Sequence, residues 1–160
     1  MRGAACLALC LIALPAAADD RVAVPSFAFT DGSGEVRDQT AEHEAQLALF
    51  NETLRGALEE GGLDVVVPEC GVDCSPGNTQ FKAMADAARA VDAQLLLVGG
   101  LHKVSTLIGT IRLSVIDLDG DEVVCTRSLT YRGDNPEAWT RAAEFTAGDV
   151  LEACFGGAPS

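Results

Sequence analysis

Apolar residues along the chain recur at two different spacings, and these spacings predict strands and helices. Residues 21–29 (RVAVPSFAF) carry valine and phenylalanine at alternating positions, which predicts a strand. Pro25 within it suggests an edge position or a bulge, since proline cannot donate a backbone hydrogen bond. Residues 40–60 instead place apolar side chains three and four positions apart, as one face of a helix does. These side chains are Leu47, Phe50, Leu54 and Leu58.

The rest of the chain continues this alternation and completes the predicted fold. The further predicted elements are a strand (63–67), a helix (79–91), three strands (94–105, 107–118 and 122–132) and a helix (137–153). Asp119-Gly120 is a hairpin turn signal between the last two strands, and Pro136 suits the first position of the last helix. The predicted order is β-α-β-α-β-β-β-α. We expect an α/β (α+β) fold, a mixed sheet with helices packed mainly on one face.

The amino-terminal residues predict export. Arg2 precedes an apolar run at 4–14, and small alanines at 16–18 form a cleavage site. The run is shorter than the roughly 20 residues that span a bilayer. Cys10 is not placed as a lipid acceptor, because Leu9 precedes it and the apolar run continues after it. We therefore expect residues 1–18 to be a cleaved signal peptide, and residues 19–160 to be a single periplasmic domain without a membrane anchor.

The net charge of the protein argues against some classes of binding partner. Loss of Arg2 with the signal peptide leaves 10 of the 11 basic residues against all 24 acidic ones, a formal charge of −14. Such a protein repels nucleic acid and anionic lipid. We expect no nucleic-acid partner, while the oligomeric state stays open.

Four cysteines remain after signal cleavage, and an even number in an exported protein favours disulfides. They are Cys70, Cys74, Cys125 and Cys154. From Cys125 the strand climbs about 23 Å to its end. The last helix then descends about 22 Å to Cys154, returning to the same level. We predict a disulfide between these two residues, and a second one, Cys70–Cys74, as a clasp on the loop PECGVDCSPGN.

Two other functions for Cys70 and Cys74 stay open. Two thiolates with three residues between them suit Cu(I), so the chain could be a copper or thiol-redox accessory protein. Thiol–disulfide catalysts, however, usually carry two residues between their cysteines. The two histidines lie far from this loop in sequence: we expect His43 on the solvated side of its helix and His102 at the surface of a strand or hydrogen-bonded there. We predict no metal site and no cofactor.

Motifs of known chemistry are missing from the sequence. The acidic stretch at 117–122 has its glycine at the fourth position, whereas a calcium loop needs it at the sixth. No nucleophile elbow, phosphate-binding loop or dinucleotide fingerprint occurs. We predict that the protein is not an enzyme.

Three stretches together resemble a known group of envelope domains. Residues 21–29 resemble the opening strand, VAVLPF, of the amino-terminal domain of the Tol translocation protein B and of CsgG-type domains. The stretch DAQLLLVGGLHKVS at 92–105 resembles their GADYVLxGxVxK strand, and IRLSVIDLDGDEVVCTRS at 111–128 resembles their VxLxDxxTGxVV hairpin. KVSTLI and RGDNPEAWTRAAEF resemble a family of uncharacterised exported bacterial proteins with this single domain. The resemblance implies an exported accessory or interaction domain and supplies no catalytic residue.

The sequence thus predicts a periplasmic, non-catalytic accessory domain that binds another envelope protein. As its interaction face we predict polar positions that alternate with apolar ones on two strands. These are Thr110, Arg112, Ser114, Thr126, Ser128 and Thr130. A further alternative is a small-molecule-binding sensor domain with a pocket between sheet and helices.

Overall fold

The computed structural model describes residues 21–69 and 81–156, and it has the predicted α/β class. Six strands and three helices follow one another along these residues. In order they are β1 (Arg21–Ala23), β2 (Ala28–Asp31), α1 (Thr40–Glu60), β3 (Asp64–Val66), α2 (Phe81–Ala90), β4 (Leu95–Ser105), β5 (Ile108–Asp117), β6 (Glu122–Arg132) and α3 (Pro136–Cys154).

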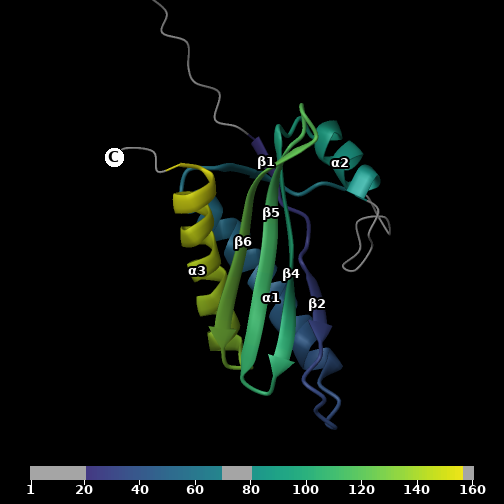
Figure 1. Cartoon of the computed structure of the whole chain (residues 1–160), viewed down its shortest axis with the longest axis vertical. Helices are drawn as coiled ribbons and strands as arrows, with labels where there is room; N and C mark the ends of the chain where they lie inside the picture. The colour runs from purple at the N-terminus through teal and green to yellow at the C-terminus, as the bar shows by residue number, and fades with distance from the viewer. Residues whose placement is uncertain (1–20, 70–80, 157–160) are drawn as a thin grey trace, which may run out of the picture.

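The strands form one mixed sheet in the order β3-β1-β4-β5-β6, with β2 also pairing with β4. The first half of β4 pairs with β1 and its second half with β2, both parallel. β3 lies parallel to β1 on the outer side. β4, β5 and β6 form an antiparallel meander, the long strands at the front of Figure 1.

The stretch predicted as one strand is two strands, because the chain leaves the sheet between Ala23 and Ala28. Pro25 lies in this break and is buried. It has no N–H to donate to a strand ladder, so the ladder stops there. Helix α1 binds the freed backbone instead: Phe27 N donates to Asn51 Oδ1 (2.8 Å), and Arg55 Nε donates to the Val24 carbonyl oxygen (2.9 Å). The prediction of one continuous strand over residues 21–29, with Pro25 at an edge position or a bulge, was therefore wrong.

The main core lies between the sheet and the pair α1 and α3, which cover one face (Figure 1). The predicted inner face of α1 is confirmed, with Phe50 and Leu54 fully buried, and α3 buries Trp139 and Val150 on its own inner face. Helix α2 packs against the opposite face of the sheet. There its residues Ala85 and Ala88 form a second, smaller hydrophobic cluster with Leu96 and Ile116. The helices thus lie mainly on one face, and α2 covers only one end of the other.

Helix α3 is capped at its start and bonded covalently to β6 at its end. Asn135 caps its start by accepting a hydrogen bond from Ala138 N (2.8 Å). The predicted disulfide Cys125–Cys154 is present, with a Cα–Cα distance of 5.5 Å. The predicted Cys70–Cys74 pair lies outside the described residues. No helix within the described ranges is both long and apolar enough to cross a bilayer.

Candidate functional site

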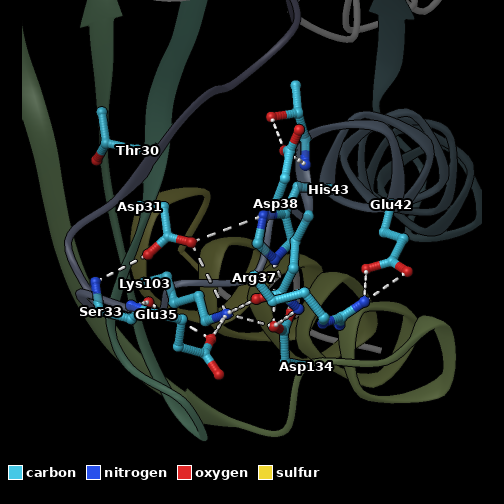
Figure 2. A network of polar contacts seen from close by, with 12 residues as sticks. Thr30, Asp31, Ser33, Glu35, Arg37, Asp38, Glu42, His43, Lys103 and Asp134 are labelled. Carbon is cyan, nitrogen blue, oxygen red and sulfur yellow. Dashed lines mark hydrogen bonds and ion pairs between the residues drawn. The ribbon is translucent and has the colours of Figure 1, made fainter.

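Lys103 forms a buried ion network at the far end of β4 (Figure 2). Its side chain is only 4% exposed. The Lys103 ammonium donates to Asp134 (2.6 Å), to Gln39 Oε1 (3.0 Å) and to Glu35. Asp31 lies 3.8 Å away. We call these residues, with His43, the Lys103 network; it ties the loop before α1 to the end of β4 and to the turn before α3.

His43 belongs to this network, so its predicted position on the solvated side of α1 was wrong. The His43 side chain is buried, and its ring lies against Phe29 (4.8 Å between centroids) and Trp139 (6.2 Å). Its Nε2 lies 3.2 Å from both carboxylate oxygens of Asp134. The physical reason is helical period: position 43 is four residues before Leu47 and lies on the same inner face of the helix.

The charges of the network reinforce one another. Burial is the largest influence on the pKa of Lys103 and lowers it. Hydrogen bonds to Asp134 and Glu35, with the charges of Asp134 and Asp31, outweigh burial and leave the pKa raised. Burial is also the largest influence on the pKa of Asp134, and for a carboxyl group it raises the pKa. Hydrogen bonds from Lys103 and His43 outweigh it and leave the pKa of Asp134 below the ordinary value. Both groups therefore stay charged near neutral pH, which suits a structural clamp better than proton transfer.

A cleft of about 540 Å³ opens beside this network, between the loop that precedes α1 and the start of that helix. Its lining includes Asp31, Glu35, Asp38 and Glu44, with Phe29 at its inner end. The described residues contain no group of three or more histidine, cysteine or acidic side chains arranged to hold a metal ion. The network's carboxylates instead surround the Lys103 ammonium.

The second candidate is the sheet face opposite α1 and α3, which we call the open face. Cross-strand register brings the six predicted polar residues together there as three pairs. The pairs are Thr110–Thr130, Arg112–Ser128 and Ser114–Thr126. Ser114 and Thr126 hydroxyls lie 3.3 Å apart. The intervening residues Ile111, Leu113 and Leu129 are buried on the helix side.

Strands β2 and β4 extend the open face in a way that the sequence analysis missed. Thr30 and His102 are paired in register, and Thr30 Oγ1 lies 2.9 Å from His102 Nδ1. The expectation of an exposed, hydrogen-bonded His102 is confirmed. With Thr110 and Arg112 these residues line a shallow hollow of about 470 Å³. Only the pairing of β2 with β4 reveals it, since Thr30 and His102 lie 72 residues apart.

Comparison with protein families gives one match over most of the chain. The family described as "Protein of unknown function (DUF2380)" matches residues 20–151. No curated protein shows significant sequence similarity to the chain.

Solved structures share the fold. The PelC dodecamer from Paraburkholderia phytofirmans is 19% identical, with a TM-score of 0.52 over 82% of this chain and 84% of that one. TolB from Acinetobacter baumannii is 10% identical, with a TM-score of 0.51 over 86% of this chain but only 28% of that one. The LpoB C-terminal domain from Escherichia coli is 16% identical (TM-score 0.49, 74% of this chain and 86% of that one). At these identities the likeness to PelC and TolB shows the fold alone.

Proposed function

The chain belongs to the family described as "Protein of unknown function (DUF2380)", and from this family and the molecule's own surface we propose a function. We propose that the mature protein is a non-catalytic accessory domain of the bacterial periplasm. In this proposal residues 1–18 are a signal peptide that is removed. The domain binds another protein of the cell envelope through its open face.

The open face is the observation that carries this proposal. It lies on long, antiparallel strands whose other side is fully packed, so its side chains are held in a rigid array. Its central pairs on β5 and β6 carry five serine and threonine hydroxyls, and each can both donate and accept a hydrogen bond. Helix α2 leaves most of it uncovered (Figure 1). A rigid array of adaptable polar groups suits recognition of a protein surface.

The context of the fold supports the same proposal. TolB carries this fold as a part of a longer chain, since the match covers 28% of it. PelC, by its description, assembles as a dodecamer. The fold is thus used in proteins that contain or assemble several units. For the Lys103 network we propose only a structural role, because its lysine is surrounded by acceptors and its charges are fixed.

Site-specific photo-crosslinking in the periplasm tests the proposal. A photoreactive residue at Ser128, on the open face, is compared with one at Glu52, exposed on α1. We expect a discrete adduct from position 128, lost on Arg112→Glu, and none from position 52. Equal adducts from both positions, or none from position 128, would contradict the proposal.

A second candidate rests on the spacing of Cys70 and Cys74. Alkylation without prior reduction, followed by native mass spectrometry, distinguishes it from a loop clasp. Labelling of these two cysteines, or a copper or zinc adduct, supports a metal or thiol-redox accessory function. Complete protection without a metal mass supports the disulfide.

A further inference from the structure

The ten basic side chains of the described residues differ in their partners, and Arg55 of α1 donates to the Val24 carbonyl oxygen and the Ser26 hydroxyl. Six of them pair with carboxylates: Arg21, Arg37, Lys82, Arg89, Lys103 and Arg127. Arg112, Arg132 and Arg141 form no ion pair or side-chain hydrogen bond with any described residue. Two of these three, Arg112 and Arg132, lie on the open face.

The outward positions of β4, β5 and β6 on the open face contain no acidic residue. Register pairs Arg132 with Ile108, two positions beyond the pair Thr110–Thr130, and therefore places it on the same face. The outward positions of β4, β5 and β6 on this face are Val98, Gly100, His102, Val104, Ile108, Thr110, Arg112, Ser114, Val124, Thr126, Ser128, Thr130 and Arg132. The excess negative charge of the protein is therefore carried by its other surfaces.

The hollow on this face gathers hydrogen-bond donors. Arg112 supplies a planar fork of N–H groups that fits a carboxylate with two parallel bonds. Thr110 and Thr30 line the same hollow, and the Thr30 hydroxyl lies against the His102 ring. Gly100 lies across from Arg112 in the register and has no side chain to fill the space between them. No carboxylate of the described chain occupies this hollow.

We infer that the hollow between Arg112, His102, Thr30 and Thr110 binds a carboxylate side chain from an acidic segment of a protein partner. This inference rests on the proposed function and specifies the partner's chemistry. The hydrogen-bond donors of the hollow have no carboxylate of the described chain beside them, so they attract a carboxylate of such a segment. The acidic remainder of the protein repels extended polyanions and anionic membranes at longer range. The hydroxyl pairs along β5 and β6 are placed to hydrogen-bond the segment's backbone.

A titration with model peptides tests the inference. The ¹⁵N-labelled mature protein receives a ten-residue glycine–serine peptide with one central glutamate in low salt, and the same peptide with glutamine at that position serves as the uncharged comparison. We expect saturable shifts at Gly100, Thr110 and Arg112 with glutamate only. A charge-assisted hydrogen bond of about 1.5–3 kcal/mol corresponds to roughly ten- to hundredfold weaker binding for Arg112→Gln.

Arg141→Gln is the matched control. Arg141 is an exposed arginine of α3 that is likewise unpaired among the described residues, so its loss removes the same charge from another surface. We expect this variant to bind within about twofold of the unaltered protein, since exposed single charges contribute little. Equal weakening by both variants would show non-specific charge attraction and overturn the inference.

Other occupants give different results. Equal binding of inorganic phosphate at the hollow, or of phosphatidylglycerol vesicles, overturns the choice of an acidic protein segment. Self-association in sedimentation that Arg112→Gln abolishes assigns the face to a second copy and also overturns it. If crosslinking at Ser128 identifies a partner while the glutamate peptide does not bind, the inference fails and the proposed function stands. If position 128 yields no adduct although the peptide binds, the proposed function fails instead.

Discussion

Replacing Lys103 by methionine removes the cation of the Lys103 network while keeping most of its apolar stem. Asp134 is only 12% exposed and Glu35 27%, so both carboxylates lose their main partner without gaining full access to water. Breaking a buried ion pair from one side costs about 3–5 kcal/mol. A domain of this size has about 5–15 kcal/mol of total stability. We therefore expect Lys103→Met to remove about a fifth or more of the free energy of unfolding.

Urea unfolding measures this loss. Trp139 is the only tryptophan and is fully buried, so its fluorescence reports the transition. Arg37→Met is the matched control, because it removes an ion pair whose members are 64% and 53% exposed. We expect this control to cost less than about 1 kcal/mol. Our reasoning about the network is refuted if Lys103→Met costs no more than Arg37→Met.

The same network predicts how stability depends on pH. The folded-state pKa of Asp134 is lowered, so its contribution is present above its unfolded pKa of about 3.9 and is lost as the pH falls through the lower folded value. The pKa of Lys103 is raised, so its contribution is present below about pH 10.4 and is lost as the pH rises through the folded value. The free energy of unfolding, measured at several pH values, should fall at both ends of the pH range. In the Lys103→Met variant it should depend less on pH.

Two further predictions concern packing and the disulfide. Replacing Cys125 and Cys154 by serine opens a loop with a sequence separation of 29 and should cost about 3–4 kcal/mol, seen as a lower urea midpoint; an unchanged midpoint would contradict the stabilising role of the bond. Gly99→Ala should destabilise, since the added Cβ would lie 2.5 Å from the Phe27 ring, whereas Gly56→Ala in α1 meets no atom within 4 Å and should stabilise by about 0.5–1 kcal/mol. Thermal unfolding of the two alanine variants should give shifts of opposite sign, and shifts of the same sign would contradict the packing argument.

Patterns within short stretches of the sequence predicted the elements that depend on interactions between residues close together in the chain. The spacing of Phe50, Leu54 and Leu58 identified the inner face of α1, and Asn135 with Pro136 marked the start of α3. The rise of a strand and of a helix sufficed to pair Cys125 with Cys154. Each of these inferences needed only one element or two adjacent ones.

The rest depended on contacts between distant parts of the chain. The Lys103 network draws residues from positions 31 to 43, from 103 and from 134, and no spacing in the sequence links them. The break at Pro25 depends on Asn51 and Arg55 reaching the backbone from α1. His43 was misplaced because its acidic neighbours suggested water, although its distance from Leu47 indicated the inner face.

The pairing of β4 with both β1 and β2 has a consequence for the order of folding. β5 and β6 meet their partners across short turns, whereas β1 and β2 must wait for a strand 72 or 73 residues later in the chain. Closing such a long loop carries a large entropy cost before any contact compensates for it. The meander should therefore form first, and the amino-terminal strands should join it late. Pulsed hydrogen exchange during refolding should protect β5 before β1, and the opposite order would contradict this sequence of events. Until β4 has formed, β2 has no strand to pair with and β1 has only the three-residue strand β3, so this part of the newly made chain stays largely unpaired until β4 is available.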